Sequence, residues 1–465
     1  MPTKWANRWG YICEEAPPDR CGVTIHFPHT DSTGPVSDVT CWRETWEDFD
    51  QCIWHADTDD KPRDELIQAR TDKPEVLDGA IIRGSNLGSS ISFANCRLNG
   101  AELTKAHCSM ADFSDSKLRY AILKDSYFFK TSFPRTNLRE ARLQNVNLQE
   151  AIFTKAELVG ISISDAIVHR ADFSDVLMYE SVLHESDFRN STFNDADLRN
   201  ADLTGSDLRF ATAVDTYLED ADMTDVTARE TNFEAAMFEN ALFTRTDIRE
   251  ANLSGADLYQ AQFSNPRINS ETEFGDTCSY EAENKSPEIA SGTSPLVAAT
   301  WVYRRLENLH EKNALADSTR QYHISKQEAQ RKLDYRNENY GRYAVATLNR
   351  YLTNHGESIQ RLLSAWIITI VGAGILYPFV GGIFDDGTLY RLRLTAEWPT
   401  IASLIEVGDV ILRGLYFSII TFTTIGYANV APNGVGSRIL VGIESLFGGI
   451  LIALFVYVLG RRVGR

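Results

Sequence analysis

A five-residue period runs through the middle of the chain without interruption. From Phe93 to Phe263, every fifth residue is Leu, Phe, Ile, Val or Met at nearly all of 35 consecutive positions; the exceptions are Cys108, Ala213 and Ala228. The residue two positions earlier in each unit is small or β-branched. Helices repeat at 3.6 residues and strands at 2, so neither explains this pattern. A fixed period sustained over this length predicts a stacked-repeat fold.

Individual units identify the kind of repeat. A-D-L-R-N at 196–200 and A-D-L-T-G at 201–205 resemble the pentapeptide-repeat family. The resemblance implies a right-handed quadrilateral β-helix with one pentapeptide per face, and we assign residues 77–263 to it. About nine coils spaced by roughly 4.8 Å would span on the order of 40 Å. The register shifts by one before Phe93, as expected of an atypical end unit.

Residues 1–76 precede the repeats and form a Cys- and Trp-rich cap. Cys52 and His55 have a C-x-x-H spacing, which is compatible with two ligands of one zinc ion. The candidate ligands of a structural zinc ion in this cap are Cys13, Cys21, Cys41, Cys52 and His55. The alternative is that these cysteines are buried free thiols in a small capping fold.

Two segments with different patterns follow the repeats. Residues 264–297 contain Ser, Asn, Glu and Pro, and predict a linker. Residues 298–358 show apolar residues at helical spacing and predict a helical hairpin that connects the repeats to a membrane domain at 359–465. The alternative is a solvated helix pair that acts only as a spacer.

The C-terminal quarter contains two apolar stretches of membrane-spanning length. Leu362–Phe384 is 23 residues long and has no charge, and Ile439–Leu459 contains only Glu444 as a charged residue. Arginines lie at the outer ends of both stretches, as at Arg361 and Arg461. This charge pattern predicts a multi-pass protein of the cell membrane whose N- and C-termini are cytoplasmic.

A third apolar run, Val410–Thr424, lies between the two spans and is too short to cross. It leads into T-T-I-G-Y-A-N at Thr423–Asn429, which favours a re-entrant pore helix followed by a loop that lines a cavity. The order of span, short helix, T-T-I-G-Y and span resembles the two-span potassium-channel family. The resemblance covers about Gln360–Leu459, roughly a fifth of the chain.

The resemblance implies a selectivity filter whose backbone carbonyls replace the hydration shell of a potassium ion. The filter residues would be Thr423, Thr424, Ile425, Gly426, Tyr427 and Ala428. Such a filter is built by four chains, so a homotetramer is implied. Residues supporting the filter would be Asn429 and Glu444, and the gating hinge would be Gly448 and Gly449.

Two filter positions depart from the family pattern. Ala428 stands where the family has its second filter glycine, and Asn429 replaces an aspartate. Both changes weaken the outer end of the filter, so we expect a relaxed potassium preference. Glu444 has two interpretations: it hydrogen-bonds to the pore helix behind the filter, or it lines the cavity and attracts cations.

Composition and motifs also bear on the partners, the source and the enzymatic activity of the chain. The formal net charge of −18 argues against nucleic acid as a partner, because phosphate binding needs basic patches. An acidic, Lys-poor surface suits a cytoplasm with very high salt, where charge is strongly screened, so we expect a halophilic, haloarchaeal source. An ordinary acidic bacterial protein is the alternative. With no nucleophile–base pair, phosphate loop or metalloprotease motif, we expect no enzymatic activity.

The combined hypothesis is a tetrameric potassium-type cation channel surrounded by membrane lipids. Its cytoplasmic repeat domain would regulate the gate or dock a cytoplasmic protein or small ligand. One alternative is a non-selective cation channel of the same architecture. The other is a membrane-anchored repeat protein of the DNA-mimic type, in which the spans act only as an anchor.

Overall fold

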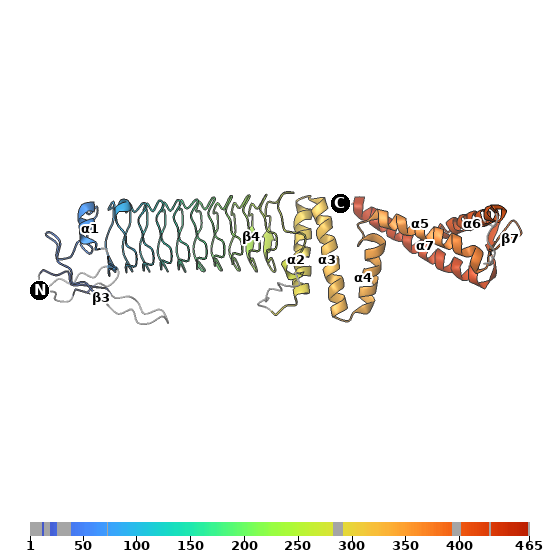
Figure 1. Cartoon of the computed structure of the whole chain (residues 1–465), viewed down its shortest axis with the longest axis horizontal. Coiled ribbons are helices and arrows are strands. Elements are labelled where there is room, and N and C mark those ends of the chain that lie inside the picture. Colours follow the sequence, from blue (N-terminus) through green and yellow to red (C-terminus); the bar gives the residue numbers. More distant parts are fainter. Residues whose placement is uncertain are drawn as a thin grey trace. The chain divides into compact units, whose positions relative to one another are not determined.

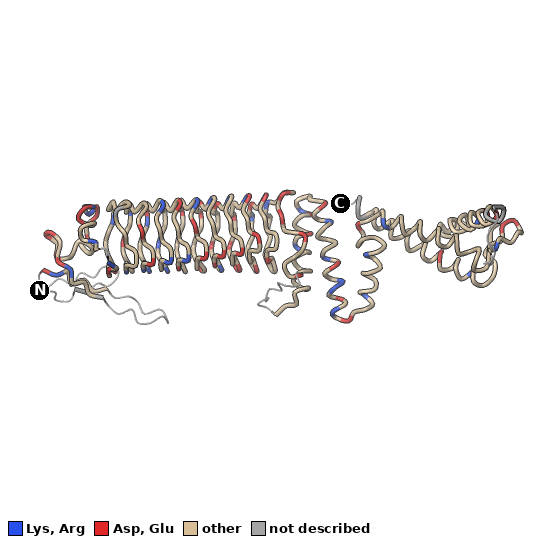
Figure 2. The backbone as a smooth tube through the Cα atoms, viewed as in Figure 1, with Lys and Arg blue, Asp and Glu red and all other residues tan. Residues whose placement is uncertain are grey.

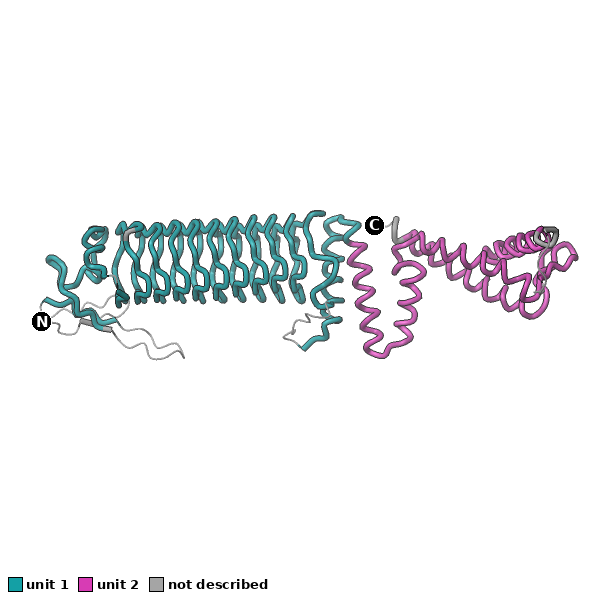
Figure 3. The backbone as a smooth tube through the Cα atoms, viewed as in Figure 1, with its two compact units in different colours: residues 1–318 teal, residues 319–465 magenta. Residues whose placement is uncertain are grey.

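The computed structural model of the chain describes residues 12–13, 19–25, 39–71, 73–281, 292–392, 401–426 and 429–463. The chain divides into two compact units, which Figure 3 colours separately. They are residues 1–318 and residues 319–465. The first unit contains the repeats, and the second contains the apolar helices.

The first unit opens with a small antiparallel sheet of order β1-β2-β3. Its strands are β1 (Ile12–Cys13), β2 (Val23–Ile25) and β3 (Val39–Thr40). Thr24 in the central strand pairs with Ile12 on one side and with Thr40 on the other. The short helix α1 (Arg63–Ala69) follows and buries Leu66.

The repeats form a coil in which each turn pairs in parallel with the next (Figure 1). Ser92 bridges Asp112, and this offset of 20 residues corresponds to four pentapeptides per turn. At the first turn the offset is 21, because Val76 bridges Arg97. The extra residue falls at the short helix η1 (Gly88–Ser90), just where the sequence predicts a register shift. The chain therefore forms a β-helix, as the five-residue period predicts.

The core of the coil explains why the five-residue period is kept. The periodic Phe and Leu side chains are almost fully buried, and Phe133, Phe153 and Phe173 stack with ring centroids 4.9 Å apart. Two residues after each buried side chain the backbone turns with positive φ, as at Asp115 and Asp175. Asn, Asp and Gly tolerate that conformation best, so the polar residues of each unit serve the corners.

The coil continues beyond Phe263, where the sequence prediction placed the start of a linker. Strands β4 (Leu242–Thr244) and β5 (Gln262–Ser264) pair in parallel. Farther on, Arg267 bridges Asp247 and Glu273 bridges Asn252. The helices η2 (Ser279–Glu281) and α2 (Pro295–Lys312) complete the described part of this unit, apart from the first residues of the next helix.

The second unit consists mainly of helices. Its elements are α3 (Ala316–Arg336), which starts just before the unit boundary, α4 (Tyr340–Thr353), α5 (Ile359–Val380), β6 (Ile383–Asp385), β7 (Thr388–Tyr390), α6 (Ile401–Phe422), β8 (Val430–Pro432) and α7 (Gly434–Val463). The three strands form a small antiparallel sheet of order β7-β6-β8. With α2, the helices α3 and α4 make three helices where the sequence predicted a hairpin.

Among the described residues, two helices are long and apolar enough to cross a membrane. They are α5 and the Gly434–Gly460 part of α7, which correspond to the two predicted spans. The helix between them, α6, has 22 residues and begins nine residues before the predicted apolar run at Val410. An i,i+4 ion pair between Asp409 and Arg413 lies at the middle of the helix. The hydropathy pattern underestimated the length of α6 because Glu406 and Asp409 interrupt the apolar residues of its first half.

Candidate functional site

The end of α6 delivers the predicted filter segment. The helix stops at Phe422, and the amide of Ile425 still donates to the carbonyl of Ile420 over 3.2 Å. Thr424 has a φ of 56° and Gly426 a φ of 59°, so the chain leaves the helix through left-handed conformations. Such a φ is a genuine outlier for a β-branched residue, and outliers of this kind gather at functional sites.

The segment lies at the carboxyl end of α6, where the helix dipole is negative and attracts cations. The Thr423 hydroxyl donates to the Ile419 carbonyl over 2.8 Å, and the Thr424 hydroxyl donates to the Thr423 carbonyl over 2.7 Å. Tyr427 and Ala428, the remaining predicted filter residues, lie outside the described residues. The described chain resumes at Asn429, whose carbonyl accepts from the Asp386 amide over 3.3 Å.

Glu444 lies on α7 and is buried, with 2% of its surface exposed. The Tyr377 hydroxyl of α5 donates to one carboxylate oxygen over 2.5 Å, and the Ser418 hydroxyl of α6 lies against the other. Through these two contacts the carboxylate on α7 links α5 to α6, about one turn before α6 ends at Phe422. This arrangement corresponds to the first of the two interpretations of Glu444. The sequence did not single out Tyr377 and Ser418, although a lone acid in a span signals that polar partners must exist.

The two predicted hinge glycines have different surroundings. A Cβ at Gly448 would lie 2.5 Å from the Phe422 carbonyl oxygen, whereas a Cβ at Gly449 would meet open space. Gly448 thus lets α7 approach the last residue of α6 closely. The hinge role of both residues stays a prediction, and the structure adds a packing role at Gly448.

A second pair of glycines, which the sequence prediction missed, brings α5 and α6 together. A Cβ at Gly374 would lie 2.8 Å from the Leu415 Cα, and one at Gly414 would lie 2.2 Å from the Gly374 carbonyl oxygen. Small residues allow helix backbones to approach closely in membranes. Their presence within apolar helices was the signal that could have identified them.

The predicted zinc ligands separate into a cluster and one outlying residue. Sγ of Cys21, Cys41 and Cys52 and a ring nitrogen of His55 lie within 4.8 Å of one another, and all four residues are buried. Cys13 lies in β1 opposite Val23, and its side chain is outside the described residues.

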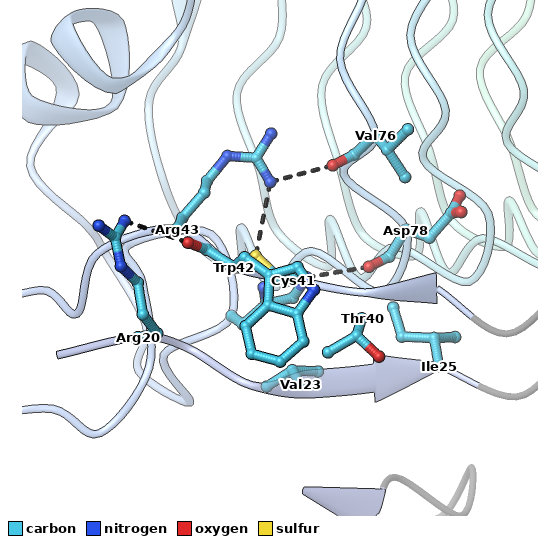
Figure 4. A pocket seen from close by; sticks show the side chains of 10 residues that line it. Arg20, Val23, Ile25, Thr40, Cys41, Trp42, Arg43, Val76 and Asp78 are labelled. Carbon is cyan, nitrogen blue, oxygen red and sulfur yellow. Dashed lines mark hydrogen bonds between the residues drawn. The ribbon is translucent and has the colours of Figure 1, made fainter. Parts of the chain in front are cut away.

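The ligand atoms of the cluster lie close to one another. Nδ1 of His55 lies 3.4 Å from Sγ of Cys21 and 3.3 Å from Sγ of Cys52, and the sulfurs of Cys41 and Cys52 lie 3.8 Å apart. On its other side, Nε2 of His55 lies 2.9 Å from the Asp78 carbonyl oxygen. Figure 4 shows Cys41 and Asp78 in this region, together with Arg43.

These contacts change the protonation of the cluster. Hydrogen bonds from Cys21 and Cys52 lower the pKa of Cys41. Burial lowers the pKa of His55, but hydrogen bonds to Cys21 and Cys41 outweigh it and raise that pKa to about 9. By contrast, burial alone raises the pKa of Cys108, inside the coil. Zinc binds deprotonated thiols and a neutral imidazole, so a metal cation would compete with protons at this cluster.

Two family models match the chain. One, described as an ion channel, matches residues 392–465, and the other, for pentapeptide repeats, matches eight copies within 89–119 and 121–265. No curated protein matches the sequence. With α5 and α7 as spans, the fold and the site define a membrane protein. The chain joins a β-helix of the pentapeptide-repeat family to a two-span channel domain of the potassium-channel type.

The similar solved structures concern the coil. One is HetL, a pentapeptide repeat protein involved in heterocyst differentiation regulation from the cyanobacterium Nostoc sp. strain PCC 7120. It is 21% identical to this chain, with a TM-score of 0.28, and the match covers 45% of this chain and 92% of HetL. The plasmid-mediated fluoroquinolone resistance protein QnrB1 is 16% identical, with a TM-score of 0.21, over 42% of this chain and 87% of its own. A pentapeptide repeat protein from the Arabidopsis thaliana thylakoid lumen is 23% identical, with a TM-score of 0.10, over 28% and 68%.

Proposed function

We propose that the protein is a homotetrameric potassium-type cation channel of the cell membrane, with both termini in the cytoplasm and no catalytic activity. The observation that carries the proposal is the position of T-T-I-G at Thr423–Gly426. It follows the carboxyl end of α6, between the two spans. Carbonyls of such a segment can replace water around a cation, and the helix dipole adds favourable potential.

An apolar stripe on α7 supports assembly of several chains. Its exposed residues are Ile439, Ile443, Leu446 and Ile450. Their spacing of three and four residues places them on one face of the helix. Within one chain this face contacts neither α5 nor α6 sufficiently to be buried, so lipid or further copies must cover it. A closed ring of four copies would also complete the filter.

A non-selective cation channel is the second candidate, because Ala428 and Asn429 depart from the potassium-channel pattern. The test is the reversal potential of the purified full chain in planar bilayers with potassium on one side and sodium on the other. We expect a potassium preference that Ala428→Gly increases. Ala431→Gly, an exposed residue of β8, is the matched control and should change nothing.

The outcomes separate the two candidates. Equal permeability to both ions in the wild-type chain and in Ala428→Gly would exclude potassium selectivity but leave a cation channel. No conduction in any variant, with the protein folded and inserted, would reject the channel proposal itself.

We further propose that the repeat domain regulates the gate or docks a cytoplasmic partner. Contacts within the second unit supply a route by which α3 can influence the first span. Glu328 of α3 pairs with His355 over 2.8 Å and with Arg350 over 3.0 Å. His355 lies in the turn that leads from α4 to α5, so a displacement of α3 would reach the start of that span.

The DNA-mimic alternative has less support. A duplex mimic needs rows of unpaired carboxylates in place of phosphates, but basic residues are interspersed among the more numerous acidic residues of the coil (Figure 2). Arg–Asp pairs of the coil include Arg135–Asp115, Arg189–Asp187, Arg199–Asp197, Arg209–Asp207 and Arg249–Asp247. Inhibition of a topoisomerase by a full chain that conducts no ions would favour this alternative over the channel.

A further inference from the structure

We propose that Cys21, Cys41, Cys52 and His55 bind one structural zinc ion that closes the N-terminal end of the β-helix. The inference is independent of the channel function, because it concerns only residues of the first unit. Three thiols and one imidazole form a ligand set that zinc takes in structural sites.

The separations of the ligand atoms fit a tetrahedral ion. Zn–S bonds of about 2.3 Å and Zn–N bonds of about 2.0–2.1 Å place neighbouring sulfurs about 3.8 Å apart, and sulfur and nitrogen about 3.6 Å apart. The sulfurs of Cys41 and Cys52 are 3.8 Å apart, and Nδ1 of His55 is 3.4 Å and 3.3 Å from two sulfurs. A disulfide would instead bring two sulfurs to about 2.05 Å.

The orientation of His55 is set from outside the cluster. The Asp78 carbonyl can only accept a hydrogen bond, so Nε2 of His55 must donate across the 2.9 Å contact. Nδ1 then faces the sulfurs as the ligand atom. Metal-binding histidines usually donate their second nitrogen in this way, which fixes the ring and raises its basicity.

Arg43 supplies a compensating charge. A zinc ion with three thiolates and one neutral imidazole carries a net charge of −1. The Arg43 guanidinium lies 3.6 Å from Sγ of Cys41 and also donates to the Val76 carbonyl over 3.0 Å (Figure 4). Arg43 therefore balances the charge of the site and links it to the first turn of the coil.

The position of Trp54 shows what the ion would stabilise. Trp54 lies between two ligands, Cys52 and His55, and is fully buried. Its ring packs edge-on against Phe93, 6.1 Å between centroids, and Phe93 is the first ring of the stacked column, 5.1 Å from Phe113. The turn that binds the metal thus holds the side chain that covers the end of the core. Repeat folds need such a cap, because an open end exposes apolar surface.

The cluster is also accessible to an ion. A cavity of about 460 Å³ is lined by Cys41 and His55, and half-exposed Trp42 stands at the same cavity. Among the described residues, this cavity provides the entry path that a metal site requires.

The first experiment measures the metal content of the purified full chain in detergent by mass spectrometry. We expect one zinc ion per chain, and replacement by cobalt should give the visible absorption of a tetrahedral cobalt–thiolate centre. The proposal would be overturned if the chain bound no zinc after one equivalent had been added, although all four thiols of the cap proved reactive once the cap was unfolded. A Cys41–Cys52 disulfide in peptide maps made without reductant would overturn it as well.

The second experiment uses variants. Cys52→Ala and His55→Ala should each lose the zinc ion and increase proteolysis of residues 39–71. Cys108→Ala, which removes a buried thiol inside the coil, is the matched control and should keep one zinc ion per chain. Should the ligand variants fail to accumulate, the cobalt spectrum of the wild-type chain still decides. Full zinc retention in Cys52→Ala would exclude this ligand set.

Discussion

The coil and the membrane-spanning helices differ in how far one chain buries its apolar side chains. In the coil, Phe153 and nearly all of the other periodic residues are buried within one chain. In the helices, Ile368 of α5 is 71% exposed and Leu446 of α7 is 66% exposed. The coil therefore completes its own core, whereas the helices depend on lipid or further copies of the chain. In the helices, side chains such as Glu444 and glycines such as Gly448 provide the specific contacts within one chain.

The largest effect should come from opening the phenylalanine column. Phe153→Ala should destabilise the coil by about 3–5 kcal/mol, because it removes a ring stacked on both sides and leaves a cavity. Ile368→Ala, which removes a side chain exposed in one chain, should change stability little by comparison. Chemical unfolding of the full chain in detergent, followed by circular dichroism, measures both. Similar losses in the two variants would contradict the contrast between the regions.

The helices should be most sensitive at their shared polar contact. Glu444→Ala should destabilise the packing of α5, α6 and α7 by about 1–3 kcal/mol, since the buried Tyr377 hydroxyl loses its carboxylate partner, whereas Ser418 keeps the Ile370 carbonyl. Thermal unfolding in detergent measures the loss, and bilayer recordings measure its effect on conduction. Ser445→Ala is a control on the neighbouring position of α7. If Glu444→Ala kept full stability and lost only conductance, a role in the cavity would replace the packing role.

The two glycines of α7 separate packing from hinge motion. Gly448→Ala should destabilise the helices by about 1–3 kcal/mol, because its Cβ would overlap the Phe422 carbonyl. Gly449→Ala has open space and should leave stability unchanged or slightly higher. Thermal unfolding and open probability are measured for both. Equal stability of the two variants, with reduced opening in both, would favour the hinge role over the packing role.

How far the sequence could predict the structure depends on the range of the interaction. The coil was predictable because its period is local, and even the shift before Phe93 was visible. Its end was missed because Pro266 and neighbouring polar residues suggested a linker, although Ile268 keeps the period and is buried. Phe274 is buried after a second one-residue shift.

The candidate sites were predictable only in part. The C-x-x-H spacing identified Cys52 and His55, since both lie on one turn, but no spacing rule places Cys21 and Cys41 beside them. Likewise, Glu444 was recognised as unusual, whereas its partner Tyr377 is 67 residues away. Contacts between distant segments depend on how helices and strands cross, and a single sequence does not specify that crossing.

The smallest effect should appear at the polar junction that links α3 to the turn before α5. Burial works to raise the pKa of Glu328, but hydrogen bonds from His355 and Arg331 lower it below the usual range. A lowered folded-state pKa contributes stability above the unfolded value of about 4.3 and loses it as the pH falls through the folded value. Because the pair with Arg350 is partly exposed and therefore screened by solvent, the contribution should stay below about 1 kcal/mol.

Hydrogen–deuterium exchange of α4 in wild-type and Glu328→Gln chains, compared at each pH, measures this contribution. The variant should exchange faster at neutral pH, and the difference should vanish in acid once the wild-type carboxylate is protonated. Glu338→Gln, an exposed residue beyond the end of α3, is the control. A difference that persists in acid would mean that Glu328 acts through packing, and the junction would then resemble the charge-independent contacts of the coil.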